Sequence, residues 1–198
     1  DWMQALAQAA QAVLCGSVIM TSERGYTNRL LWVSPLGDVQ YYDKRHLFRM
    51  AQEHQHYSAG QEKLVTSLAG FNCCPLICYD LRFPVFSRNL GKAVDVLVYV
   101  ANWPAKRAAH WRALLQARAI ENQCYVVGIN RSGTDGNGHR YAGDSLMADF
   151  GGALLADAGN SGQSASLRAT MSRDNLVAFR EKLPFLLDAD RHGSTGRP

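Results

Sequence analysis

The stretch that decides the fold reads Pro75-Leu76-Ile77-Cys78-Tyr79-Asp80-Leu81-Arg82-Phe83-Pro84. Its apolar first part predicts a buried strand, and the charged, proline-closed part predicts a turn that opens into a helical pattern. A side chain at such a turn is held by rigid elements and can face a cleft, where the amides of the turn can donate to a developing oxyanion. Cys78 is therefore a candidate nucleophile, although a free cysteine is also often a buried structural residue.

Apolar runs and helical patterns alternate on both sides of this turn. We expect strands at residues 14–20, 26–33, 39–42, 63–68, 74–77, 94–100, 124–129 and 165–171, with a further hairpin at 146–155. We expect helices at residues 2–13, 85–90, 105–121 and 172–182, and loops at 43–60 and 131–143. Mixed strands with intervening helices predict a single domain over residues 1–198, in which helices cover stacked sheets.

The composition limits the classes of function. The net charge of +4 comes from basic residues scattered along the chain, without the clustered stripe of a nucleic-acid binder. We therefore expect no nucleic-acid partner. No segment has the apolar length needed to span a bilayer, so we expect no membrane partner either. The five cysteines have no regular disulfide spacing, which is typical of a reducing compartment and predicts a cytoplasmic location.

Five segments resemble, in the same order, the motifs of the nitrilase superfamily of carbon–nitrogen hydrolases. They are a lysine motif at residues 41–48, a nucleophile motif at 78–84, a site-lining segment at 100–104, the end of a long helix at 118–122, and Gly143-Asp144-Ser145. The resemblance implies a four-layer α-β-β-α sandwich that assembles as a homodimer through its helical face. It also implies hydrolysis of a small-molecule amide without a metal or an organic cofactor.

Residues 44–48 and 53–57 are most similar to those of bacterial omega-amidases. This similarity implies an amidohydrolase that cleaves a small ω-amide, of the 2-oxoglutaramate or 2-oxosuccinamate type, to an acid and ammonia through a cysteine thioester.

The resemblance also assigns roles to individual residues. Cys78 would be the nucleophile, and Lys44 would place its ammonium beside the oxyanion, with the backbone N–H of Tyr79 as the second donor. Glu53 would orient the lysine, and Trp103 would form a wall of the substrate pocket. An ammonium near the thiol should also favour the thiolate. Without the resemblance, Lys44 would be interpreted as a solvated loop charge.

One feature of the superfamily is missing from the sequence. Its general-base glutamate lies well before the lysine motif, near the end of an early strand. The carboxylates before Lys44 are Asp1, Glu23, Asp38 and Asp43, and none is placed to act as that base. We therefore expect the domain to be incomplete at its N-terminus, which leaves a non-catalytic or inactive truncated member of the superfamily as the alternative function.

Two other kinds of site compete for the same cysteine. Cys73, Cys74, Cys78 and His46 offer zinc ligands, but adjacent residues on a strand point to opposite faces, and no Cys-x2-Cys pair is present. A catalytic dyad of Cys78 with His46 or His110 is the second option, and the spacing gives it no particular support.

Overall fold

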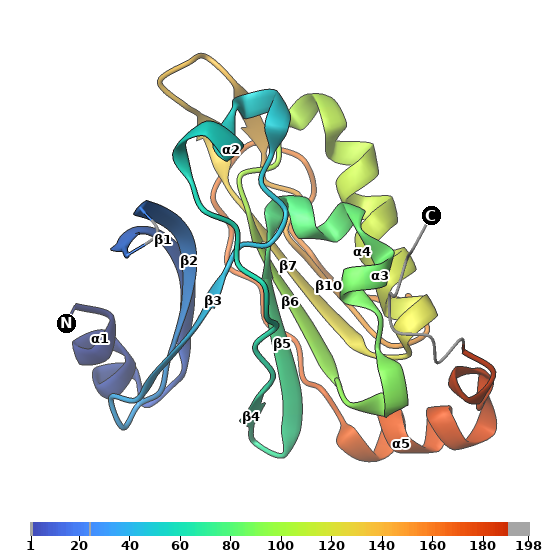
Figure 1. Cartoon of the computed structure of the whole chain (residues 1–198). Helices are drawn as coiled ribbons and strands as arrows, with labels where there is room; N and C mark the ends of the chain where they lie inside the picture. The colour runs from blue at the N-terminus through green and yellow to red at the C-terminus, as the bar shows by residue number, and fades with distance from the viewer. Residues whose placement is uncertain (1, 24, 190–198) are drawn as a thin grey trace, which may run out of the picture.

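The computed structural model describes residues 2–23 and 25–189; Asp1, one of the carboxylates considered above, lies outside them. Helix α1 (Trp2–Ala10) covers one face of a three-stranded sheet, and a six-stranded sheet packs on the other face (Figure 1). Helices α3 (Pro84–Ser87) and α4 (Ala108–Asn122) cover the far side of the larger sheet. The predicted α-β-β-α layering is thereby confirmed.

The smaller sheet is an antiparallel meander. Its strands are β1 (Leu14–Ser22), β2 (Gly25–Val33) and β3 (Val39–Asp43), in that spatial order. Helix α1 docks on it through the buried side chains of Met3 and Ala7, which pack with Val33. The predicted strands at 14–20, 26–33 and 39–42 correspond to these three elements.

The larger sheet is mixed and has the strand order β11-β10-β7-β6-β5-β4. Its strands are β4 (Thr66–Leu68), β5 (Phe71–Ile77), β6 (Val96–Ala101), β7 (Tyr125–Asn130), β10 (Leu146–Ala148) and β11 (Leu154–Asp157). The three central strands β5, β6 and β7 are parallel, so their carboxyl ends meet at one edge of the sheet. In open α/β sheets this edge is where ligands bind.

The core lies between the two sheets and under α4. Leu30 and Trp32 of the smaller sheet belong to the same buried cluster as Leu76 and Leu97 of the larger one. Strand β6 is buried along nearly its whole length, as its continuous apolar run predicts. On the other face, Gly128 of β7 leaves room for α4, because a Cβ there would lie 2.4 Å from Cδ1 of Leu115.

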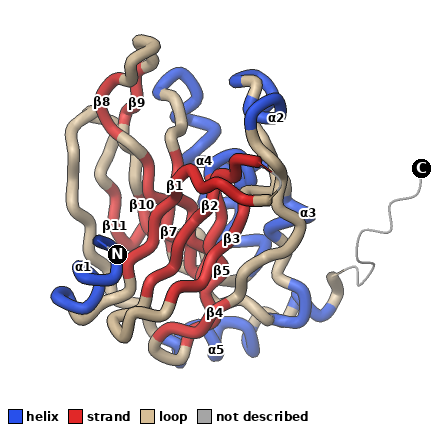
Figure 2. The backbone as a smooth tube through the Cα atoms, turned by 60° about the vertical axis from the view of Figure 1, so that its left-hand side comes forward, coloured by secondary structure: helices blue, strands red, loops and turns tan. Residues whose placement is uncertain are grey.

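The polar segments contain more regular structure than the sequence predicts. Residues 131–143 form a small hairpin of β8 (Ser132–Thr134) and β9 (Arg140–Ala142), which Figure 2 shows at the same end of the molecule as α2 (Glu53–His56). Asp135 stabilises the turn, since its carboxylate accepts hydrogen bonds from the N–H groups of Asn137 and His139 at 2.9 Å. Short 3₁₀ helices complete the structure, at Arg49–Ala51, Cys78–Arg82, Leu90–Lys92, Ala105–Arg107 and Phe185–Leu187.

The predicted strand at residues 165–171 is wrong. This segment is mostly exposed and pairs with no strand in the described part of the chain. Helix α5 (Arg173–Lys182) follows it as predicted, and Ser172 caps the helix by accepting from the N–H of Asn175 at 3.2 Å. No helix within residues 2–23 and 25–189 is long and apolar enough to cross a membrane.

Candidate active site

A pocket of about 430 Å³ opens at the carboxyl edge of the parallel strands. The five residues assigned above line it together: Cys78, Lys44, Glu53, Tyr79 and Trp103. Cys78 and Tyr79 lie in the 3₁₀ helix that follows β5, and Trp103 lies in the segment that follows β6. Lys44 directly follows β3, and Glu53 is the first residue of α2. The predicted convergence of nucleophile, lysine and glutamate in one cleft is confirmed.

Cys78 has an unusual backbone conformation. It is the first residue of the 3₁₀ helix Cys78–Arg82, with a φ of 46°, a left-handed value that costs a residue with a side chain about 1–3 kcal/mol. The N–H of Tyr79 lies in the first turn of this helix, where amides have no intrahelical acceptor. The turn can therefore offer a backbone donor immediately beside the Cys78 thiol.

The environment of the Cys78 thiol favours its protonated form. Burial raises the pKa of Cys78, and this effect outweighs the opposing attraction of the Lys44 ammonium. The thiol Sγ lies 4.0 Å from the carbonyl oxygen of Asn102. The Lys44 ammonium favours the thiolate, as predicted, although burial has the larger effect on the pKa of Cys78. Deprotonation of Cys78 therefore has to accompany the reaction.

Lys44 is a buried cation held by one carboxylate. Only 2% of its side chain is exposed, and its Nζ donates to both oxygens of Glu53, at 2.9 and 2.7 Å. Glu53 also accepts a hydrogen bond from the N–H of Phe48 at 2.6 Å. Interpreting Lys44 as a solvated loop charge is therefore wrong, because Lys44 is fixed in place and aimed into the pocket that holds Cys78.

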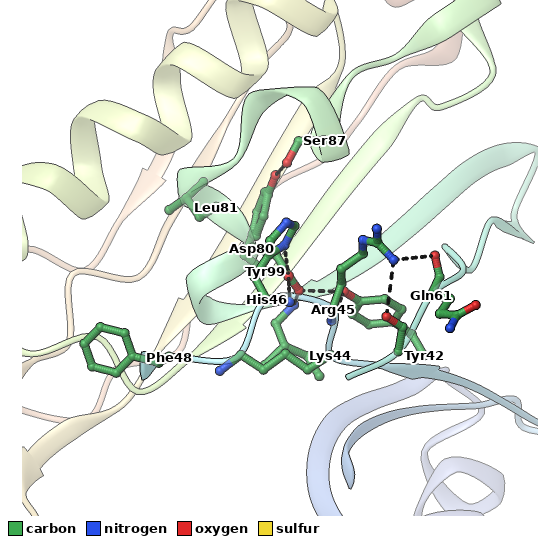
Figure 3. A network of polar contacts seen from close by, with 12 residues as sticks. Tyr42, Lys44, Arg45, His46, Phe48, Gln61, Asp80, Leu81, Ser87 and Tyr99 are labelled. Carbon is green, nitrogen blue, oxygen red and sulfur yellow. Dashed lines mark hydrogen bonds and ion pairs between the residues drawn. The ribbon is translucent and has the colours of Figure 1, made fainter. Parts of the chain in front are cut away.

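A second carboxylate, which the sequence did not predict, joins the lysine loop (residues 44–52) to the nucleophile turn (Cys78–Arg82). Asp80 is fully buried, and one of its oxygens accepts from the hydroxyl of Tyr42 at 2.7 Å and from the N–H of Ile77 at 3.0 Å. The other oxygen contacts the N–H of His46 at 3.1 Å and its Nδ1 at 2.8 Å (Figure 3). The only signal in the sequence was an acid two residues after the candidate nucleophile.

Two further groups brace the walls of the site. Trp103 is 3% exposed, and its indole N–H donates to the carbonyl of Arg107 at 2.8 Å. Its backbone N–H donates to Oδ1 of Asn130 at 2.7 Å, which ties the ends of β6 and β7 together. Arg118 of α4 donates to the carbonyl of Leu81 at 2.7 Å and so holds the nucleophile turn from behind.

The competing sites do not form. Neither His46 nor His110 lines the pocket, and their Nδ1 atoms contact Asp80 and Arg82 at 2.8 and 3.1 Å. Within the described residues, no group of three or more histidine, cysteine or acidic side chains is arranged to hold a metal ion. Glu23 and Asp38 do not line the pocket, as expected.

Comparison with known proteins decides the family. The family model described as carbon-nitrogen hydrolase matches residues 1–181. The chain belongs to the carbon–nitrogen hydrolase family. This carbon–nitrogen hydrolase is 52% identical over 190 residues to the omega-amidase YafV of Escherichia coli (strain K12), a match that covers 96% of this chain and 73% of that protein.

Other members of the family agree with this placement. The chain is 36% identical to the 2-oxoglutaramate amidase of Bacillus subtilis (strain 168), over 89% of its length and 68% of that protein. Its fold matches, with a TM-score of 0.93 and 44% identity, a CN-hydrolase superfamily protein from Xanthomonas campestris whose crystal structure has an arsenic adduct in the active site. That match covers 96% of this chain and 74% of the other.

Proposed function

We propose that this carbon–nitrogen hydrolase cleaves the terminal amide of a small ω-amide, of the 2-oxoglutaramate or 2-oxosuccinamate type, to the acid and ammonia. The observation that carries the proposal is the joint placement of Cys78 and the Lys44–Glu53 pair in one pocket. The likeness to an omega-amidase and a 2-oxoglutaramate amidase supports this choice of substrate.

The reaction proceeds in two halves. Sγ of Cys78 attacks the amide carbon, and the carbonyl oxygen becomes an oxyanion that receives hydrogen bonds from Nζ of Lys44 and the N–H of Tyr79. The C–N bond then breaks, ammonia leaves with the proton of the thiol, and a thioester remains on Cys78. Water attacks the thioester carbon, the C–S bond breaks, and the acid is released as the thiol is restored.

Glu53 acts in this scheme as a positioning residue. Its two oxygens hold Nζ of Lys44 by a paired contact, which compensates the buried charge and fixes its direction. Trp103 forms a wall of the pocket, and its indole N–H is fixed by the hydrogen bond to the Arg107 carbonyl. The pocket needs no metal ion or organic cofactor for these steps.

The direct test is ammonia release from 2-oxoglutaramate, measured alongside intact-protein mass after rapid acid quench. We expect turnover by the chain, a mass increase corresponding to an acyl group on Cys78, and loss of both signals in Cys78→Ala. Turnover that persists in Cys78→Ala would contradict the cysteine mechanism.

The second candidate is a chain that holds the site but does not turn over substrate. The observation that favours it is the state of the two carboxylates that line the described pocket. Glu53 is paired with Lys44, and Asp135 accepts a hydrogen bond from the hydroxyl of Tyr141 at 2.7 Å, so neither is free to serve as a base. Binding of 2-oxoglutaramate without release of ammonia would identify this candidate.

The proposal extends to the state of the protein in the cell. We expect residues 1–198 to act as a single domain, in the cytoplasm, and as a homodimer formed through the helical layer. The five cysteines are all free, which suits a reducing compartment, and Ile120 on α4 leaves 49% of its surface exposed at that layer. Sedimentation velocity would test the dimer, and an Ile120→Asp variant should shift it to monomer.

A further inference from the structure

The charges that line the pocket do not cancel. Four basic and two acidic side chains line it: Lys44, Arg82, Lys106, Arg107, Glu53 and Asp135. Lys44 and Glu53 neutralise each other, at 2.7 Å. Asp135 is occupied by its own hairpin, where it accepts from a hydroxyl and two backbone N–H groups. Three cations therefore face the pocket with one carboxylate against them, which favours an anionic ligand.

Arg107 is the best positioned of these three cations. It lies at the N-terminal boundary of α4, and its carbonyl is fixed by the hydrogen bond from the indole of Trp103 at 2.8 Å. The residue is half-buried, and its guanidinium carbon lies 5.5 Å from the centroid of the Phe48 ring. Arg107 thus bridges the segment after β6 and the lysine loop while it faces the pocket.

The guanidinium of Arg107 has no carboxylate partner among the described residues. Four other buried or half-buried arginines do have one: Arg29 with Asp43, Arg112 with Asp157, Arg118 with Glu121, and Arg180 with Asp95. Among the half-buried arginines of the described chain, Arg82 and Arg88 also lack a carboxylate partner, but Arg88 does not line the pocket. An arginine side chain offers a planar fork of donors that matches a carboxylate in two-pronged geometry. The unpaired fork of Arg107 is therefore available to a ligand.

The other two cations are less suited to that role. Nη2 of Arg82 lies 3.1 Å from Nδ1 of His110, and its guanidinium carbon lies 4.8 Å from the centroid of the Trp103 ring. Arg82 thus lines the pocket with its guanidinium already in contact with His110 and Trp103. Lys106 is exposed, where a flexible ammonium gives a weaker and less directional contact.

We propose that Arg107 is the specificity-determining residue of the pocket, and that it binds a carboxylate at the end of the substrate remote from the scissile amide. The inference rests on the proposed function, and it assigns a residue to the carboxylate that 2-oxoglutaramate and 2-oxosuccinamate share. Cys78 and Arg107 come from different elements that line one pocket, so a short chain with an amide at one end and a carboxylate at the other meets both.

Succinate binding tests the subsite without any turnover. The full chain, Arg107→Gln and the control Arg168→Gln would be titrated with succinate by isothermal titration calorimetry. Arg168 is exposed and does not line the pocket, so its variant removes the same charge elsewhere. We expect Arg107→Gln to bind about 10- to 100-fold more weakly, as for a lost charge-assisted contact, and Arg168→Gln to bind like the parent.

Several results of this titration would overturn the assignment. One is an equal affinity for succinate in the parent and in Arg107→Gln. Another is a parent that does not bind millimolar succinate. The third is a loss of succinate affinity in Arg82→Gln that Arg107→Gln does not show. Should Arg107→Gln fail to fold, as judged by circular dichroism, Arg107→Lys gives the same comparison, because it keeps the charge and loses the fork.

Kinetics separate this inference from the proposed function. With succinamate, kcat/KM of Arg107→Gln should fall by about 10- to 100-fold, mainly through KM, whereas with the uncharged amide butanamide the two proteins should differ less than threefold. Equal losses on both amides would indicate a structural defect and refute the specificity role. If the parent hydrolyses neither amide yet binds succinate through Arg107, the subsite stands and the hydrolytic proposal fails.

Discussion

At the scale of single residues, Lys44 is a buried cation whose position in the pocket suggests a use in the reaction. Its side chain is 2% exposed, and Glu53 is its one ion-pair partner in the described chain. A buried ammonium held by a carboxylate is costly to assemble, and the pair gains its use only if Nζ also meets a developing negative charge.

Substitution of Lys44 tests this use. We expect Lys44→Ala to lower kcat on 2-oxoglutaramate by about 10²-fold or more, the scale of one lost oxyanion donor. Arg45→Ala is the matched control and should cost little, because Arg45 does not line the pocket. Its guanidinium contacts the carbonyls of Gly60 and Gln61, at 3.5 and 3.3 Å, and lies 5.7 Å from the centroid of the Phe86 ring. Equal losses in the two variants would mean that the integrity of the loop had been measured instead.

The thiol of Cys78 has a pH dependence of definite sign. Burial raises its pKa above the ordinary value of 9.0, so the thiolate fraction, and with it the rate of alkylation by iodoacetamide, should keep rising beyond pH 9. Lys44 opposes this shift, so Lys44→Ala should react more slowly at pH 8 than the parent. Stopped-time labelling with mass spectrometry measures both rates, and a plateau below pH 8 would contradict the assignment.

The label should also fall on Cys78 before the other cysteines. Burial raises the pKa of Cys15 to about 12 and the pKa values of Cys73 and Cys74 to about 11, and Cys124 is fully buried with its pKa raised as well. None of these four lines the pocket. Labelling of the buried Cys73, Cys74 and Cys124 should require unfolding, and the half-buried Cys15 should react more slowly than Cys78 in the native state.

The sequence predicted the site residues that lie within recognisable motifs, and it did not predict the others. Cys78, Lys44 and Glu53 could be placed together because each lies in a segment with its own recognisable sequence. Three of the four contacts of Asp80 could not be predicted, since they join the nucleophile turn to Tyr42 and His46, which lie far from it in the chain. The left-handed φ of Cys78 likewise depends on the surrounding fold and not on the cysteine itself.

At the scale of elements, apolar periodicity located the sheets and the long helices. It failed in the polar segments for two different reasons. The Asp135 carboxylate stabilises the turn of the β8–β9 hairpin. The two short strands of this hairpin have no alternation of apolar and polar residues that would predict them. Residues 165–171 alternate as a strand would, yet they lie exposed beside no pairing partner in the described structure.

The contact between α4 and β7 depends on one missing side chain. A Cβ at Gly128 would lie 2.4 Å from Cδ1 of Leu115 and 3.0 Å from the ring of Trp111. We expect Gly128→Ala to lower the free energy of unfolding by about 1–3 kcal/mol, because the helix must shift away from the sheet. Gly136→Ala is the control, since a Cβ there meets nothing within 4 Å. Urea denaturation compares them, and equal stabilities would refute this account of the packing.

At the scale of the whole molecule, α5 is tied to the edge of the larger sheet opposite the pocket. Arg180 is 5% exposed; its Nη1 donates to Asp95 at 2.7 Å, and its other nitrogens donate to the carbonyls of Gln123 and Val94 at 2.8 and 2.7 Å. One guanidinium therefore joins α5, the start of β6 and the start of β7. The carboxyl edge of the same strands carries the site.

Loss of this tie should destabilise the chain without touching the site. Arg180→Met leaves Asp95 buried without its cation, and we expect a loss of about 3–5 kcal/mol in the free energy of unfolding. Asp95→Asn in the Arg180→Met background should recover part of the loss, and Lys182→Met, exposed on the same helix, should change little. Kcat of the protein that remains folded should stay within twofold of the parent; a larger fall would show coupling between the two edges.

The left-handed backbone at Cys78 also affects which substitutions at this position are favourable in evolution. Glycine fits a φ of 46° without steric cost, so the residue that best suits the fold at this position is not the one that can attack a carbonyl. We expect Cys78→Gly to be more stable than Cys78→Ala by about 1 kcal/mol, although both lose the thiol. A gene copy freed from selection for catalysis would thus gain stability as it lost its nucleophile, and its inactive descendants would persist as well-folded proteins.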